Sequence, residues 1–168
     1  MHKDKHFGTA KFYIFALVAR IQLEIPDTLP FSCRLPIRVT DLNYAVHLAN
    51  DKVLSMMHEA RAQFFISHGY TEMKAEGASF IMSDTAIVYK SEGFYGQTLR
   101  CEVGAGDFSR VAFDLYYRFV IEGEEKVLAE AKTGMVCFDY EKRKVRSLPE
   151  ALKRKLGAPT SPSNSQPA

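Results

Sequence analysis

The sequence of 168 residues has no tryptophan and only three cysteines, Cys33, Cys101 and Cys137. The cysteine count is odd and no Cys-x-x-Cys pair occurs, which argues against a disulfide framework and against a zinc ribbon. The five histidines include no His-Glu-x-x-His spacing, so a zincin site is not expected either. We therefore expect reduced cysteines, no bound metal and no cofactor.

The chain also lacks a dominant charge and a long hydrophobic run. Lysine and arginine total 22 against 20 for aspartate and glutamate, a net charge of +2, so no global field favours nucleic acid or an anionic membrane. Residues 12–19 form an apolar run after a basic start, but this run is far shorter than the roughly 20 residues that span a bilayer. No small-x-small cleavage site follows it. We expect a cytoplasmic protein.

What is present is the composition of a globular protein. Hydrophobic residues make up 46% of the chain and charged residues 25%, with 12 phenylalanines and 8 tyrosines. The length suits one domain. We expect an N-terminal extension over residues 1–30, with a short strand near 12–23, a folded domain over 31–156, and a disordered tail over 157–168, which is rich in Pro, Ser and Asn.

The pattern within the domain predicts one long helix and a run of strands. Residues 51–68 place Val53, Met57, Ala60 and Phe64 on one helical face, with Asn50 or Asp51 as the cap and Gly69 as the stop. Strands are expected at 31–39, 80–89, 99–103, 111–121 and 129–137, and a short helix at 148–156. This order predicts an α+β fold in which an antiparallel sheet of five strands wraps around the single long helix. One helix cannot cover such a sheet, so we expect an oligomer.

The segment 38–50 carries the chemistry, because it gathers Asp41, Asn43, Tyr44, His47 and Asn50 just before the helix. A helix N-terminus presents unpaired N–H groups and a positive dipole end, which would polarise a carbonyl and stabilise an oxyanion. A nearby carboxylate would activate water or attack directly. Asp and Asn in such a loop also serve as turn formers and helix caps, so the pattern alone leaves the function open.

Residues 40–50, followed by 54–61, resemble the hotdog-fold acyl-CoA thioesterases, in the branch of the 4-hydroxybenzoyl-CoA thioesterases and YbgC-like proteins. Residues 129–139 resemble the last strand of that family, and the similarity covers about residues 31–153. The resemblance implies that the chain hydrolyses an acyl-CoA or acyl carrier protein thioester. It further implies a site at the interface of a homodimer or a dimer of dimers.

The resemblance also implies residue roles. Asp41 would be the general base or nucleophile, Asn43 and His47 would position water or substrate, and N–H groups between His47 and Asn50 would hold the thioester oxygen. The chain departs from the family at residues 43–45, Asn-Tyr-Ala, where many members carry one or two glycines. This departure leaves the partner of Asp41 open.

Further residues are candidates for substrate contact. Leu48 and Asn50 would lie at the helix start, and Met57, Phe64 and Phe80 would line an acyl tunnel, although a plain core explains these three equally well. Glu59 is a rival carboxylate on the helix, but it lies opposite the apolar face, which favours a surface or subunit contact. Arg61 at the edge of that face is expected to extend its charged end to solvent or to pair.

Basic residues for the phosphates of CoA would come from the strands and the segment after them. The candidates are Lys90, Arg100, Arg110, Arg118 and the basic run 142–146, with a solvated face as the simpler interpretation of each.

Two other functions remain open on this fold. A hydroxyacyl-thioester dehydratase would carry a His-x-x-Pro-Gly signature, which this sequence lacks. A non-catalytic acyl-CoA sensor would bind without turnover, and fold analogy alone does not distinguish it from an enzyme.

Overall fold

The structure is a computed structural model that describes residues 21–157. The strand expected near 12–23 therefore lies almost wholly outside the described residues, as does the tail beyond 157. The helices and strands of the described part follow in chain order: β1 (Phe31–Pro36), the 3-10 turn η1 (Val39–Asp41), α2 (Asn50–Ser67), β2 (Ser79–Tyr89), β3 (Thr98–Gly106), β4 (Ala112–Ile121), β5 (Lys126–Asp139), β6 (Lys144–Val145) and α3 (Glu150–Leu156).

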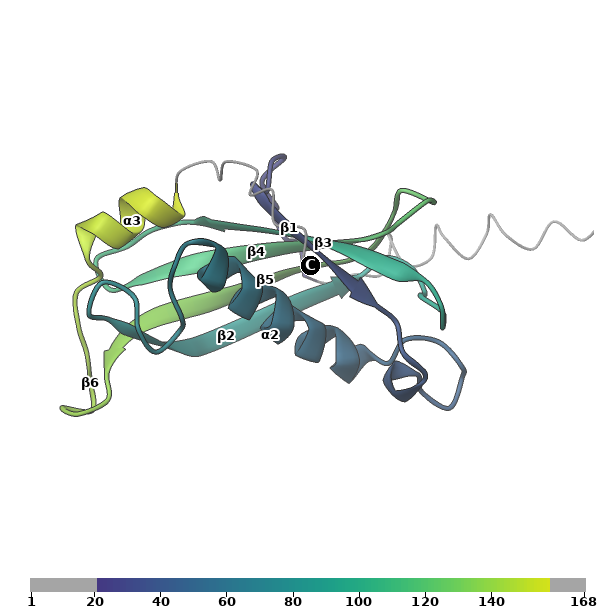
Figure 1. Cartoon of the computed structure of the whole chain (residues 1–168), viewed down its shortest axis with the longest axis horizontal. Helices are drawn as coiled ribbons and strands as arrows, with labels where there is room; N and C mark the ends of the chain where they lie inside the picture. The colour runs from purple at the N-terminus through teal and green to yellow at the C-terminus, as the bar shows by residue number, and fades with distance from the viewer. Residues whose placement is uncertain (1–20, 158–168) are drawn as a thin grey trace, which may run out of the picture.

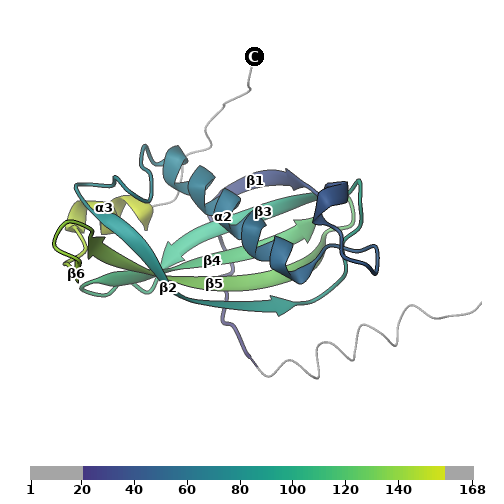
Figure 2. The same cartoon turned by 90° about the horizontal axis from the view of Figure 1, so that it is seen from below.

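The strands form one antiparallel sheet in the order β1-β3-β4-β5-β2, and α2 lies across one face of it (Figures 1 and 2). The five predicted strands are present, and in β4 and β5 the inward faces are those that the alternation of the sequence predicts. In β4 the residues Phe113, Leu115, Tyr117, Phe119 and Ile121 are all buried. The five matching residues of β5, from Ala129 to Cys137, are fully buried too.

The described residues contain a sixth strand, so the expectation of five was wrong. Lys144 and Val145 pair with Asp139 and Phe138 of β5. The Asp139 carboxylate accepts hydrogen bonds from the N–H groups of Glu141 and Lys142, at 3.1 and 2.9 Å, and closes a tight turn. A strand of two residues shows no alternation of polar and apolar side chains, so β6 could not be recognised within the basic run 142–146.

The long helix is displaced by one residue from its predicted range. It starts at Asn50 after the N-cap Ala49, and no side chain caps it, so the expected cap by Asn50 or Asp51 was wrong. It ends before Gly69, whose φ of 77° and N–H bond to the Ile66 carbonyl (2.8 Å) stop the helix as predicted.

Strand β1 ends at Pro36 instead of the predicted Val39. The Ile37 N–H still bonds to the Gln97 carbonyl at 2.9 Å, but the next N–H group, that of Arg38, turns to the Asp41 carboxylate. This bond starts η1 and directs the chain away from the sheet toward the beginning of α2. None of the helices within residues 21–157 is long and apolar enough to span a membrane.

The packing of α2 predicts a sharp contrast between two neighbouring side chains. Phe64 is completely buried and packs edge-on against Phe31 and Phe65, whereas Ile66 is 65% exposed. We expect Phe64→Ala to lower the free energy of unfolding by about 3–5 kcal/mol, because it opens a cavity in the core. Ile66→Ala is the matched control and should change it by less than about 0.5 kcal/mol. Urea denaturation measures both, and equal losses would contradict this placement of the helix.

Candidate functional site

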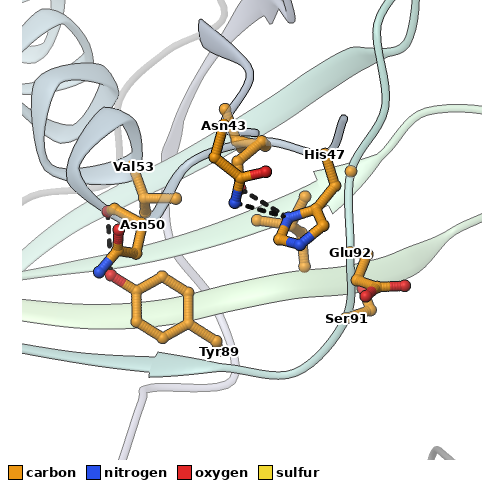
Figure 3. Close-up of a pocket in the computed structure, with 10 residues that line it drawn as sticks. Asn43, His47, Asn50, Val53, Tyr89, Ser91 and Glu92 are labelled. Atoms are coloured by element: carbon orange, nitrogen blue, oxygen red, sulfur yellow. Dashed lines mark hydrogen bonds between the residues drawn. The ribbon is translucent and has the colours of Figure 1, made fainter. Parts of the chain in front are cut away.

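A cavity of about 310 Å³ lies where the segment before α2 meets the segment that follows β2 (Figure 3). This volume is at the lower end of the range usual for small-molecule sites, about 300–1,000 Å³. Its wall combines amide, imidazole, hydroxyl and carboxylate groups with apolar side chains. The lining residues are Asn43, His47, Leu48, Asn50, Val53, Tyr89, Ser91, Glu92, Gly93 and Leu128. The site residues Asn43, His47, Leu48 and Asn50, predicted from the sequence, thus share one cavity.

One wall of the cavity is a tight loop that holds His47. The Ala45 N–H donates to Oδ1 of Asn43 at 2.8 Å, which turns the Asn43 Nδ2 group toward His47. His47 Nδ1 lies 3.4 Å from that Nδ2 atom and 3.2 Å from the Leu48 carbonyl oxygen (Figure 3). Because Nδ1 faces the loop, Nε2 is the ring nitrogen left for a ligand.

The start of α2 forms the end of the cavity. Two of the predicted carbonyl-binding N–H groups are already used, since Leu48 donates to the Gly93 carbonyl (2.8 Å) and Ala49 to that of Asp41 (2.9 Å). The first turn of α2 begins at Asn50 with no side-chain cap, and the Lys52 N–H already donates to the Ala49 carbonyl at 3.1 Å. The N–H groups of Asn50 and Asp51 are therefore the ones suited to an oxyanion. The Tyr89 hydroxyl donates to the Asn50 carbonyl at 3.0 Å. Burial and the Asp51 carboxylate raise the pKa of Tyr89, which keeps this donor protonated.

The opposite wall follows β2 and was not predicted from the sequence. Ser91, Glu92 and Gly93 lie here, and Gly93 is buried against Leu128 and Ile37. A Cβ atom on Gly93 would stand 2.5 Å from Cδ1 of Leu128 and 2.8 Å from Cδ1 of Ile37. The glycine therefore permits the close approach of the two loops, and its place just after an apolar strand was the signal available in the sequence.

Asp41 is not among the residues that line the cavity. Its Oδ2 atom accepts a hydrogen bond from the Arg38 N–H at 2.8 Å, and the Arg38 Nε atom lies 3.9 Å away. The carboxylate thus anchors η1, while the backbone carbonyl of Asp41 holds the Ala49 N–H. Its predicted role as base or nucleophile stays a prediction.

The residues predicted to line an acyl tunnel do not reach this cavity. Met57 and Phe64 have no exposed surface, and Phe80 is 2% exposed and stacks on Phe65. Phe80 also borders a separate groove with His58 and Tyr140 on the outside of α2. In the single chain Met57, Phe64 and Phe80 are core residues. This agrees with the simpler expectation, a plain core, rather than with an acyl tunnel.

The two charged helix candidates also lie elsewhere. Glu59 is exposed and accepts a hydrogen bond from Nε2 of Gln63 at 2.7 Å, one turn along the helix. Arg61 is buried, and its Nε atom donates to the Glu72 carboxylate at 2.7 Å. The expectation that Arg61 pairs is confirmed.

Three of the basic residues proposed for phosphate contact, Lys90, Arg100 and Arg118, have carboxylate partners. Lys90 lies 3.2 Å from Glu130, and Arg100 bonds to both Glu102 and Glu125. The Arg118 guanidinium bonds to Glu102 and to the backbone carbonyls of residues 26 and 27. These pairs neutralise Lys90, Arg100 and Arg118 and favour the solvated-face interpretation for these three, whereas Arg110 is exposed and is in none of these pairs. Lys142, Arg143 and Lys144 are exposed at the hairpin. Residues 21–157 contain no group of His, Cys, Asp and Glu side chains that could hold a metal ion.

Comparison with known proteins assigns the family. The family model described as the thioesterase-like superfamily matches residues 37–156, which include the whole cavity wall. The chain belongs to the thioesterase-like superfamily. Its enzyme class is therefore that of the thioester hydrolases, as the sequence predicts. No curated protein matches the chain.

Solved structures agree with the fold. A 1,4-dihydroxy-2-naphthoyl-CoA thioesterase from Synechocystis is 19% identical with a TM-score of 0.68, over 75% of this chain and 94% of its own. A thioesterase from Thermus thermophilus complexed with coenzyme A and zinc is 21% identical with a TM-score of 0.67, over 78% and 95%. The probable thioesterase YbaW from Escherichia coli is 20% identical with a TM-score of 0.63, over 77% and 98%.

The loop that carries His47 contains a strained residue. Val46 has a φ of 64°, in the left-handed region that β-branched residues avoid, and its side chain is 66% exposed. Its N–H bonds to the Asn43 carbonyl at 3.0 Å, and the Asn43 N–H bonds to the His47 carbonyl at 3.0 Å. The left-handed turn at Val46 therefore brings His47 back beside Asn43.

This strain predicts opposite effects of glycine at two exposed valines of the segment. We expect Val46→Gly to raise the free energy of unfolding by about 1 kcal/mol, because glycine adopts this conformation without a steric penalty. Val39 is 68% exposed and is not among the positive-φ residues of the described chain. Val39→Gly should lower the same quantity by about 0.5–1 kcal/mol. Denaturation curves test the pair, and a loss at both positions would contradict the strain.

Proposed function

We propose that the chain hydrolyses an acyl-CoA thioester to the free acid and CoA in the cavity of Figure 3. The observation that carries the proposal is the meeting of His47 and Asn43 with an uncapped start of α2 in one cavity. The names of relatives support the substrate, since one is a naphthoyl-CoA thioesterase and another is complexed with coenzyme A. The reaction needs no cofactor, because CoA is part of the substrate.

The thioester carbonyl would lie against the first turn of α2. The N–H groups of Asn50 and Asp51 and the positive end of the helix dipole would stabilise the oxyanion of the tetrahedral intermediate. His47, held through Nδ1, would present Nε2 to the water or to the departing thiolate. The thiolate is a good leaving group, so attack on the carbonyl is the step that most needs help.

Asp41 has two possible roles, and one variant distinguishes them. As an anchor it needs only an acceptor oxygen for the Arg38 N–H, which asparagine also supplies. As a general base or nucleophile it needs the charge, and its Oδ1 atom would have to act while Oδ2 accepts the Arg38 N–H. Because of this bond and its place outside the lining residues, we favour the anchor.

The test measures thiol release from a panel of acyl-CoA thioesters. We expect release by the wild type, and retention of kcat within tenfold by Asp41→Asn, because the variant keeps the hydrogen bond that anchors η1. A loss of about 100-fold or more without a change in thermal stability would instead support the catalytic role of Asp41. Binding of acyl-CoA without thiol release would favour the non-catalytic alternative. Hydration of an enoyl-CoA substrate with CoA retained would favour the dehydratase.

We further propose that the working form is a homodimer or a dimer of dimers joined through β2. This strand ends the sheet order β1-β3-β4-β5-β2 and has eleven residues, a long edge to leave unpaired. Its side chains include Met82, which is 44% exposed. A second copy on this edge would lie beside Tyr89 at the cavity.

Sedimentation velocity checks the assembly. We expect the species at micromolar concentration to have the mass of two or four chains, because pairing of the β2 edges satisfies backbone groups that water otherwise solvates. A monomer that retains full thioesterase activity would contradict an interfacial site. A monomer without activity that gains it on concentration would support one.

A further inference from the structure

The cavity is lined by a carboxylate that was not predicted as a site residue from the sequence. Among its ten lining residues Glu92 is the only acidic one, and it lies on the wall next to His47 in Figure 3. We propose that Glu92 is the general base that activates water for attack on the thioester. This proposal rests on the proposed function and assigns a further catalytic residue to it.

The backbone on both sides of Glu92 is fixed. Before it, the Ser91 N–H donates to the Leu128 carbonyl at 3.1 Å and its hydroxyl to the Val127 carbonyl at 2.8 Å. After it, the Gly93 carbonyl accepts the Leu48 N–H at 2.8 Å, and the absent side chain of Gly93 lets the loop approach Leu128. The backbone at Glu92 is therefore held beside the cavity, and its exposed carboxylate is not neutralised by an ion pair within the described residues.

No ion pair involves Glu92 within residues 21–157. The other carboxylates near the site differ from it in their bonds or in their place. Asp41 is bound to Arg38, and Glu59 lies on the outer side of α2 with Gln63. Asp51 is in the first turn of α2 but does not line the cavity. Glu92 is thus the carboxylate that shares a space with the imidazole and the helix start.

The proposed step balances without any further reactant. A water molecule held between Glu92 and His47 forms a bond to the thioester carbonyl carbon, while its proton passes to the Glu92 carboxylate. The carbonyl π electrons move to the oxygen, which the N–H groups of α2 stabilise. Collapse of the intermediate breaks the carbon–sulfur bond, and the thiolate takes up the proton from Glu92 to give CoA and the acid.

The test compares Glu92→Gln with two matched variants, Asp41→Asn and Glu59→Gln. Each exchanges one carboxylate for its amide. We expect Glu92→Gln to lower kcat by about 100-fold or more with KM within threefold, and the other two to stay within tenfold. Thermal melting of Glu92→Gln should equal that of the wild type, since the Glu92 side chain makes no structural bond in the described chain.

A second variant separates a base from a residue that only shapes the cavity. Glu92→Asp keeps a carboxylate and should retain more of kcat than Glu92→Gln. A residue that only shapes the cavity would lose at least as much with the shorter aspartate as with the glutamine of equal length. Retention of kcat within threefold by Glu92→Gln, in a wild type that releases thiol, would overturn the role of Glu92 and leave the proposed function intact. Absence of thiol release from the wild type would instead overturn the proposed function.

Discussion

The site depends on one backbone hydrogen bond, from the Leu48 N–H to the Gly93 carbonyl at 2.8 Å. It joins the segment before α2 to the segment after β2, which are more than forty residues apart in sequence. The two segments meet this closely because Gly93 has no side chain where Leu128 and Ile37 pack. An alanine there would have to displace two core side chains, and the cavity walls would separate with them.

The same bond determines which helix N–H groups remain for chemistry. The N–H groups of Leu48 and Ala49 are already hydrogen-bonded within the loop. The N–H groups that remain for a ligand are therefore those at the start of α2, from Asn50. A capping side chain would have satisfied these groups and stabilised the helix by about 1 kcal/mol. The chain has alanine at this position instead. An uncapped helix end beside a cavity is consistent with a site that reserves its N–H donors for a ligand.

Much of this architecture is predictable from the sequence, because it follows from periodicity. Alternation along β4 and β5 identifies their buried faces residue by residue, and the helical stripe from Val53 to Phe64 identifies the packed side of α2. The clustering of Asn43, His47 and Asn50 is also predictable, since these residues are close in the chain. Glu92 was missed because only the tertiary contact through Gly93 brings it near His47. The anchoring of Asp41 was missed for a related reason, since a single hydrogen bond to the Arg38 N–H decides whether its carboxylate faces the cavity.

The strained conformation of Val46 also contributes to the geometry of the site. A left-handed residue is required between Asn43 and His47 so that the two side chains meet, and the chain makes this turn with a β-branched residue at a φ of 64°. Valine restricts the unfolded loop and stiffens the turn more than glycine does. Greater stability from glycine at this position would therefore come with a looser imidazole. The position balances fold stability against the fixed orientation of His47, and a fixed orientation is what a group beside a reacting carbonyl requires.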